Sequence, residues 1–177
     1  IICPFAQDYY ARLFNEGLVK LQLGEGGCSC NTEIINDDID YEQITFRPNS
    51  SLINIEWSFN NPSYVSEVDL VTGDLTEIYQ FDPGVIDYYV NYLVSTDDVT
   101  LYSMFWFIYG SDSIWRIDLD DQTFTLIGRT GFPARGDLTL FNGQVYYHTY
   151  SASGIWGIVQ VDLADPPNST LFTNTPQ

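Results

Sequence analysis

The sequence predicts an all-β domain built from four repeated units. Segments of one pattern recur along the chain, with anchor residues at positions 22, 69, 118 and 162 that lie 47, 49 and 44 residues apart. The runs around each anchor are rich in β-branched and aromatic residues and are separated by turn-forming residues, which is typical of strands. The apolar fraction of 45%, with 16% aromatic residues, predicts a packed core. The units cover residues 1–36, 43–80, 86–128 and 136–173.

The first unit is the weakest match to the repeat. It carries Gln22 where the other units carry an aspartate. Residues 8–17 are the main exception to the strand pattern, because Tyr10, Leu13 and Phe14 would share one face of a helix. We therefore expect one short N-terminal helix there.

The second and third units match each other closely. Residues 68–78 and 117–127 can be laid over one another, and each consists of a strand, a turn that begins with aspartate, and a second strand. In the third unit, residues 104–109 do not alternate between apolar and polar types, which is typical of a strand buried on both faces. This apolar run is far shorter than the roughly 18 residues that a spanning helix needs, so no membrane insertion is expected.

The fourth unit shows the strand order most clearly. Asn142-Gly143 separates two β-type runs, and an Asn-Gly pair in this setting is the strongest short-range hairpin signal. A third strand runs up to Asp162, and residues 170–173 supply a fourth after the turn at Pro166-Pro167. We therefore expect four consecutive antiparallel strands in each unit.

At these residues the chain resembles β-propeller repeat proteins, whose blades carry a pattern of the type Ile-Asp-x-x-Thr-Gly-x-x-Thr-x-Ile. Residues 64–78 match it in full, 114–128 nearly in full and 155–172 loosely. The resemblance implies a single small propeller-like domain over residues 1–177, with about four blades of about 44 residues each. Proteins that share this pattern have unrelated functions.

The charge of the chain excludes two classes of partner. There are 24 acidic and only 6 basic residues, which gives a formal net charge of −18. Nucleic acids and anionic membranes are both held by lysine and arginine side chains, so neither is an expected partner.

The three cysteines, Cys3, Cys28 and Cys30, indicate an extracellular chain that is secreted or displayed at the cell surface. Cys28 and Cys30 are too close in sequence to bridge each other comfortably, so we expect Cys3 to pair with one of them. An alternative is a zinc site formed by the three cysteines and His148. Two glycosylation sequons, at Asn49 and Asn168, lie in predicted turns, so the chain is a candidate glycoprotein.

The acidic residues offer two kinds of site. Asp69, Asp118 and Asp162 recur just before turns, where an aspartate caps the turn by accepting backbone N–H bonds. Calcium is the only cofactor that the acids suggest, and solvated turns explain them more simply because no EF-hand loop is present. The calcium candidates are Asp37, Asp38, Asp40, Asp120 and Asp121.

Catalytic motifs are missing from the sequence. There is no G-x-S-x-G elbow and no glycine-rich phosphate loop, and a triad would have to use the single histidine, His148. We expect a non-catalytic structural or binding module that self-assembles into a fibril or other homo-oligomer through its β-prone ends, Ile1-Ile2 and residues 171–173. The alternative is a carbohydrate-binding or carbohydrate-active protein that uses exposed tryptophans to stack on sugars. The four tryptophans are Trp57, Trp106, Trp115 and Trp156.

Overall fold

The computed structural model describes residues 8–13, 17–23, 30–37, 43–56, 64–81, 89–106, 112–150 and 156–173. The described residues form strands and one 3-10 turn. The first sheet holds β1 (Asp8–Leu13), β2 (Gly17–Leu23) and β3 (Cys30–Asn36). The second sheet holds β4 (Gln43–Phe46), β5 (Leu52–Glu56), β6 (Tyr64–Val68) and β7 (Leu75–Gln80).

The other two sheets also have four strands each. The third sheet holds β8 (Tyr89–Ser95), β9 (Thr100–Trp106), β10 (Ser113–Asp118) and β11 (Thr123–Arg129). The fourth sheet holds β12 (Ala134–Phe141), β13 (Gln144–Tyr150), β14 (Trp156–Val161) and β15 (Thr170–Thr173), with the 3-10 turn η1 (Pro166–Asn168) before β15. No helix of the described residues is long and apolar enough to cross a membrane.

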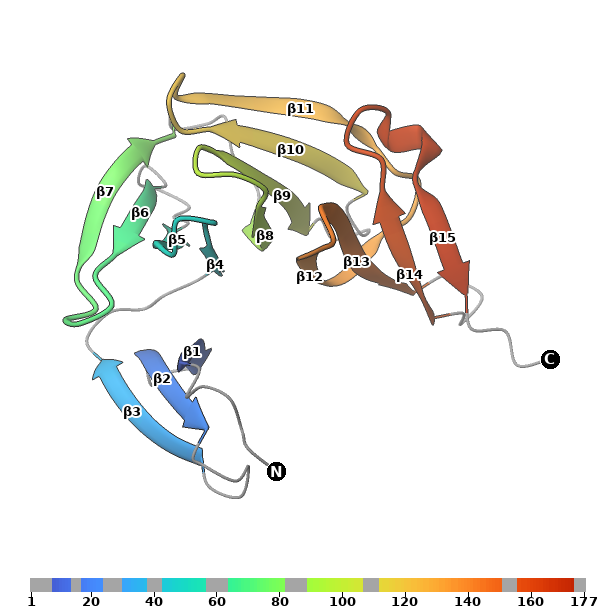
Figure 1. Cartoon of the computed structure of the whole chain (residues 1–177). Coiled ribbons are helices and arrows are strands. Elements are labelled where there is room, and N and C mark those ends of the chain that lie inside the picture. Colours follow the sequence, from blue (N-terminus) through green and yellow to red (C-terminus); the bar gives the residue numbers. More distant parts are fainter. Residues whose placement is uncertain are drawn as a thin grey trace.

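Every sheet is antiparallel, and strands that follow one another in sequence are neighbours in the sheet. Figure 1 shows the four sheets following one another along an arc, with β4, β8 and β12 on its inner side and β7, β11 and β15 on its outer side. The chain is therefore all-β, and its sheets lie side by side in the manner of propeller blades.

The N-terminal helix expected over residues 8–17 is wrong. Residues 8–13 form β1, which pairs with β2 from Leu13 opposite Gly17 to Asp8 opposite Gln22. Tyr10 packs against the contact between the first two sheets and lies 5.6 Å from Phe46, measured between ring centroids. Long-range packing of this kind outweighs a helical spacing of three apolar residues, because helix periodicity in a short segment is a weak preference.

Glycine is required where β2 begins. Gly17 has a φ of +75°, and a Cβ at this position would collide with the carbonyl of Asn36 on β3. The same left-handed conformation recurs in the hairpin between β12 and β13, where Asn142 and Gly143 have φ values of 50° and 74°. Two successive positive φ values match the strand twist of a two-residue hairpin, as the Asn-Gly pair predicted.

Three hydrophobic clusters join successive sheets. Leu18 packs with Leu52 and Val68 between the first and second sheets. The second and third sheets are joined by a cluster that includes Ile53, Ile55, Val65, Leu93, Leu101 and Ile117. The third and fourth are joined by one that includes Met104, Ile114, Val145, Tyr147, Val159 and Val161. Among the described residues, no such cluster joins the fourth sheet to the first.

A β-bulge recurs at one repeat position in three sheets. The register shifts between Leu18 and Val19 in β2, between Val65 and Ser66 in β6, and between Ile114 and Trp115 in β10. Each shift lies three to four residues before the anchor of its unit, and the extra residue is on the last strand of the sheet. The first sheet thus shares its register with the second and third, although Gln22 replaces the aspartate.

Candidate functional site

The three aspartates that the sequence predicted as turn caps accept backbone N–H bonds through Oδ1. Asp69 accepts two, at 2.7 and 3.2 Å, from the residues two and three positions further on. Asp118 accepts one at 3.1 Å, and Asp162 accepts two at 3.0 Å. Asp69 and Asp162 follow the third strand of their sheets and Asp118 is the last residue of its third strand, so the three are engaged locally and at separate turns. Such bonds stabilise a turn and bind no ligand.

Asp97 is a fourth aspartate of this kind, which the sequence pattern missed. Its Oδ1 accepts the N–H groups of Val99 and Thr100 at 3.0 and 2.6 Å in the turn between β8 and β9. The signal was available in Asp97-Asp98, a turn-type pair just before a strand.

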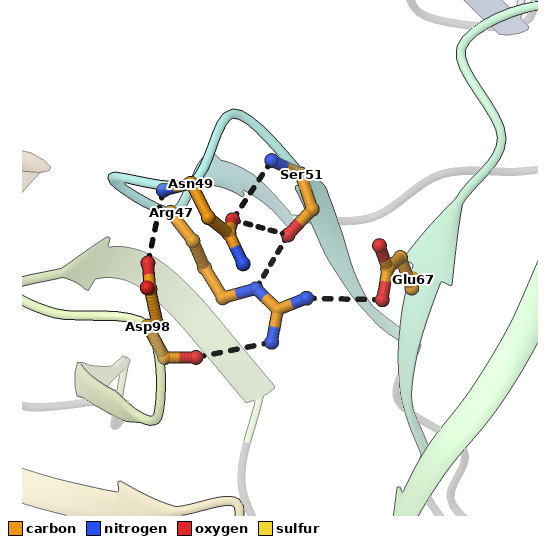
Figure 2. Close-up of polar contacts among 5 residues, drawn as sticks. All are labelled: Arg47, Asn49, Ser51, Glu67 and Asp98. Atoms are coloured by element: carbon orange, nitrogen blue, oxygen red, sulfur yellow. Dashed lines mark hydrogen bonds and ion pairs between the residues drawn. The ribbon is translucent and has the colours of Figure 1, made fainter.

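Arg47 connects the second sheet to the third, as Figure 2 shows. Its guanidinium donates to Ser51 Oγ, to the carbonyl of Asp98 at 3.0 Å and to Glu67 Oε2 at 2.9 Å. The N–H of Asn49 donates to Asp98 Oδ1 at 2.9 Å. The arginine side chain is only 12% exposed, and these contacts occupy all three of its nitrogens. This cluster therefore joins two blades and leaves no free cation for a ligand.

The two sequon asparagines differ in their contacts. Asn49 Oδ1 accepts hydrogen bonds from the N–H and the hydroxyl of Ser51 at 3.0 and 2.9 Å, and no contact engages its Nδ2 in Figure 2. Asn168 instead donates from Nδ2 to Asp165 Oδ2 at 2.7 Å. Both side chains are exposed. Asn49 therefore presents the atom that would carry a glycan, while that atom of Asn168 is already bonded.

The predicted metal and disulfide sites are only partly described. Cys3, Cys28, Asp38 and Asp40 lie outside the described residues, and of Cys30 only the backbone in β3 is described. Asp37 is exposed at the end of β3, and Asp120 and Asp121 are exposed in the turn after β10. Within the described part of the chain, no three histidine, cysteine, aspartate or glutamate side chains are grouped so that they could hold a metal ion. The disulfide, the zinc site and calcium binding stay predictions.

The fourth sheet has one face that carries large apolar side chains and is exposed. We call it the open face. Cross-strand pairs place Tyr150 beside Trp156 and His148 beside Ile158, which in turn pairs with Phe172. The exposed fractions are 64% for Phe141, 56% for Trp156, 52% for Ile158, 51% for Phe172 and 37% for Tyr150. Large apolar side chains gathered on one sheet face mark an interaction surface more often than isolated ones do.

An apolar groove of about 560 Å³ runs over the open face. It is lined by Phe141, Tyr146, His148, Ile158 and Phe172, with Asp137 and Thr139 also among its lining residues. Burial raises the pKa of the Asp137 carboxyl above its ordinary value. The groove is therefore an apolar surface with the Asp137 carboxyl at its side.

Aromatic rings stack at the end of the open face. The ring of His148 lies 4.7 Å from that of Trp156, nearly parallel at 9°, and the ring of Tyr150 lies 4.4 Å from it, tilted by 46°. Towards the opposite end of these strands lies a polar hollow of about 400 Å³, whose lining includes Gln144, Gln160 and Asn168. Gln160 donates to Gln144 at 3.2 Å. His148, which the sequence offered for zinc or a triad, thus lies in an aromatic stack.

Trp115, the other tryptophan whose side chain is described, does not join Trp156 in an exposed platform. Trp115 stacks on Phe124 at 4.5 Å and packs against the cluster between the second and third sheets. Trp57 lies outside the described residues, and the side chain of Trp106 is not described. Among the described side chains, Trp156 is therefore the tryptophan available to a partner or ligand.

No family model matches this chain, and no curated protein matches it. Solved structures do match. A structure of the nidogen/laminin complex has a TM-score of 0.56 at 13% identity over 94% of this chain and 61% of the other. TolB from Acinetobacter baumannii has a TM-score of 0.51 at 16% identity, over 96% of this chain and 41% of the other. Puromycin hydrolase has a TM-score of 0.52 at 13% identity, over 90% of this chain and 25% of the other.

These similarities confirm the fold class predicted from the sequence, a β-propeller-like all-β domain. The chain spans between a quarter and about three fifths of the length of these three structures. They include an enzyme, puromycin hydrolase, as well as proteins that are not enzymes. At such low identity the likeness carries the fold alone, so the function must be argued from this chain's own surfaces.

Proposed function

We propose that this chain is a non-catalytic extracellular module that self-associates through the open face of its fourth sheet. The observation that carries the proposal is the exposure of Phe141, Tyr150, Trp156, Ile158 and Phe172 on a single sheet face. Covering such a face removes apolar surface from water, at about 25 cal/mol for each Å² buried. Two chains that each carry a net charge of −18 repel one another, so an apolar face is the natural place for contact between them.

The C-terminal apolar run, residues 170–173, would contribute to self-association through its side chains. Residues 170–173 form β15, paired with β14 inside their own sheet. Leu171 packs against the cluster between the third and fourth sheets, while Phe172 belongs to the open face. The contribution of this run is therefore a side-chain face and not a free strand donated to a neighbour. The other predicted end, Ile1-Ile2, lies outside the described residues.

Ile158→Asp should abolish self-association while the protein stays folded. A carboxylate in the middle of the covered face would have to be desolvated without a partner. The measurement is sedimentation velocity over a hundredfold range of protein concentration, with circular dichroism to check folding. We expect the sedimentation coefficient of the wild type to rise with concentration and that of the variant to stay at the monomer value.

The matched control is Val71→Asp. Val71 is also apolar and 86% exposed, but it lies in the turn between β6 and β7, away from the open face. This variant adds the same charge and should associate like the wild type. Association should also tighten as salt rises, because the two copies repel one another through net charges of −18. A wild-type protein that remains monomeric at every concentration and salt would contradict the proposal.

We also propose that Asn49 carries a glycan when the chain passes through a secretory pathway. Its Nδ2 is free of the contacts that hold its Oδ1, so a sugar could be attached without breaking the turn. Expression in a glycosylating host should give a product that a deglycosylating enzyme shifts on a gel. Asn49→Gln should remove most of the shift, and Asn168→Gln should change it less. A full shift that persists in Asn49→Gln would contradict the assignment.

Carbohydrate binding is the second candidate, and the stack at Trp156 favours it. An exposed indole that is stacked on His148 and in contact with Tyr150 is a rigid platform for the apolar face of a sugar. A glycan array read out with the wild type and with Trp156→Ala tests it. Binding that is lost in this variant would favour this candidate, and an empty array would reject it.

A further inference from the structure

The residues four positions before the anchors occupy equivalent places in the four sheets, and the one in the fourth sheet differs from the others in its burial. These residues are Leu18, Val65, Ile114 and Ile158. Leu18, Val65 and Ile114 are all fully buried, and each lies in the cluster that joins its sheet to the following one. Ile158 is 52% exposed. The open face is thus the equivalent of a face that is buried against the next sheet wherever a next sheet is present.

Residues one position before each anchor form the complementary series. Val68, Ile117 and Val161 are at most 3% exposed, and each lies in the cluster with the preceding sheet. Each of the three clusters between sheets therefore holds a residue four before one anchor and the residue one before the next anchor. Leu21, the first member of this second series, has no preceding sheet among the described residues and is half-buried.

We infer that the open face of one copy packs on the outer face of the first sheet of a second copy. This outer face carries Val19, Leu21, Thr32 and Ile34, which share one side of the β2–β3 pair. None of these four residues is charged, and although Val19 is buried, Ile34 is 56% exposed. Ile158 of one copy would then lie in one cluster with Leu21 of the other, as Ile114 and Val161 share a cluster within the chain. This inference rests on the proposed self-association and names the two surfaces that meet.

The two surfaces are different, so the contact is head-to-tail. A heterologous contact leaves one unused face at each end of any open assembly, and a further copy can always be added. In Figure 1 the first and fourth sheets lie at the two ends of the arc, where each could meet the neighbouring copy. Two open faces packed on each other would instead give a symmetric dimer and no larger species.

The test is a mixing experiment with two variants that each lack one surface. Ile158→Asp should prevent packing through the open face, and Ile34→Asp should prevent packing through the outer face of the first sheet. Leu21→Asp is a second variant of that outer face. Because Ile34 is already exposed, its replacement should leave the fold intact even if the Leu21 variant does not fold. All are compared with the wild type by sedimentation velocity and light scattering.

We expect the wild type to form species larger than dimers and each variant alone to be monomeric. A 1:1 mixture of Ile158→Asp and Ile34→Asp should give dimers only, with the weight-average mass about doubled, since one intact pair of surfaces remains. If the wild type associates and Ile34→Asp associates equally well, the head-to-tail inference is overturned while the proposed function stands. A mixture of folded variants that stays monomeric also overturns it. A monomeric wild type overturns both.

Discussion

Ile114→Ala should lower the free energy of unfolding by about 3 kcal/mol, whereas Ile158→Ala should lower that of the monomer by less than about 1 kcal/mol. The two isoleucines occupy the same position of the repeat and lose the same atoms. Ile114 is fully buried between the third and fourth sheets, so its truncation leaves a cavity. Ile158 is half-exposed on the open face, so water fills the space.

Urea denaturation at low protein concentration, where the monomer predominates, measures both values. The comparison is its own control, because side-chain chemistry and strand position are matched. Equal losses from the two variants would mean that Ile158 is covered within the monomer, for instance by closure of the first sheet onto the fourth. That result would remove the basis for self-association through the open face.

The architecture was predictable because each repeat contains turn-forming residues whose effect depends only on their near neighbours in the sequence. The aspartates at positions 69, 118 and 162 each accept backbone N–H groups from their own turn, and a signal of this kind needs no knowledge of distant residues. The same holds for Asn142-Gly143, where both φ values are positive as a two-residue hairpin requires. The spacing of these signals then fixes which strands share a sheet.

The first unit shows where local reading fails. Tyr10, Leu13 and Phe14 are spaced as on a helix, yet β1 forms because Tyr10 packs with Phe46 and with the cluster around Leu18. Phe46 is 36 residues away in sequence, so the contact could not be predicted from the residues around Tyr10. Packing between sheets therefore decided the structure of a segment whose own pattern favoured a helix.

The open face could not be found from the sequence for a related reason. Ile158 and Ile114 look alike as residues and stand at the same distance from their anchors. Only the count of sheets that follow distinguishes them, because a third sheet has a fourth beside it and the described fourth sheet has none. The position of a blade in the arc, more than the composition of its strands, therefore determines whether this face is buried or exposed.

Arg47→Ala should lower the free energy of unfolding by about 2 kcal/mol, the largest effect that we expect for any charged residue of the described chain. The guanidinium joins the turn after β4 to the carbonyl of Asp98 in the third sheet and to Glu67 in β6. Its removal leaves that carbonyl without this donor and loosens the contact between two blades. Hydrogen bonds of this kind are worth more than an exposed ion pair because the arginine is only 12% exposed.

Arg116→Ala is the matched control and should cost less than about 1 kcal/mol. Arg116 pairs with Asp118 at 2.6 Å, but it is 47% exposed and its partner lies on the same strand. Urea denaturation of the two variants at low protein concentration compares them directly. Arg47→Lys should fall between the wild type and Arg47→Ala, because one ammonium cannot reach Ser51, Asp98 and Glu67 together. If Arg47→Ala cost no more than Arg116→Ala, the cluster in Figure 2 would be a surface contact and the apolar clusters alone would hold the second and third sheets together.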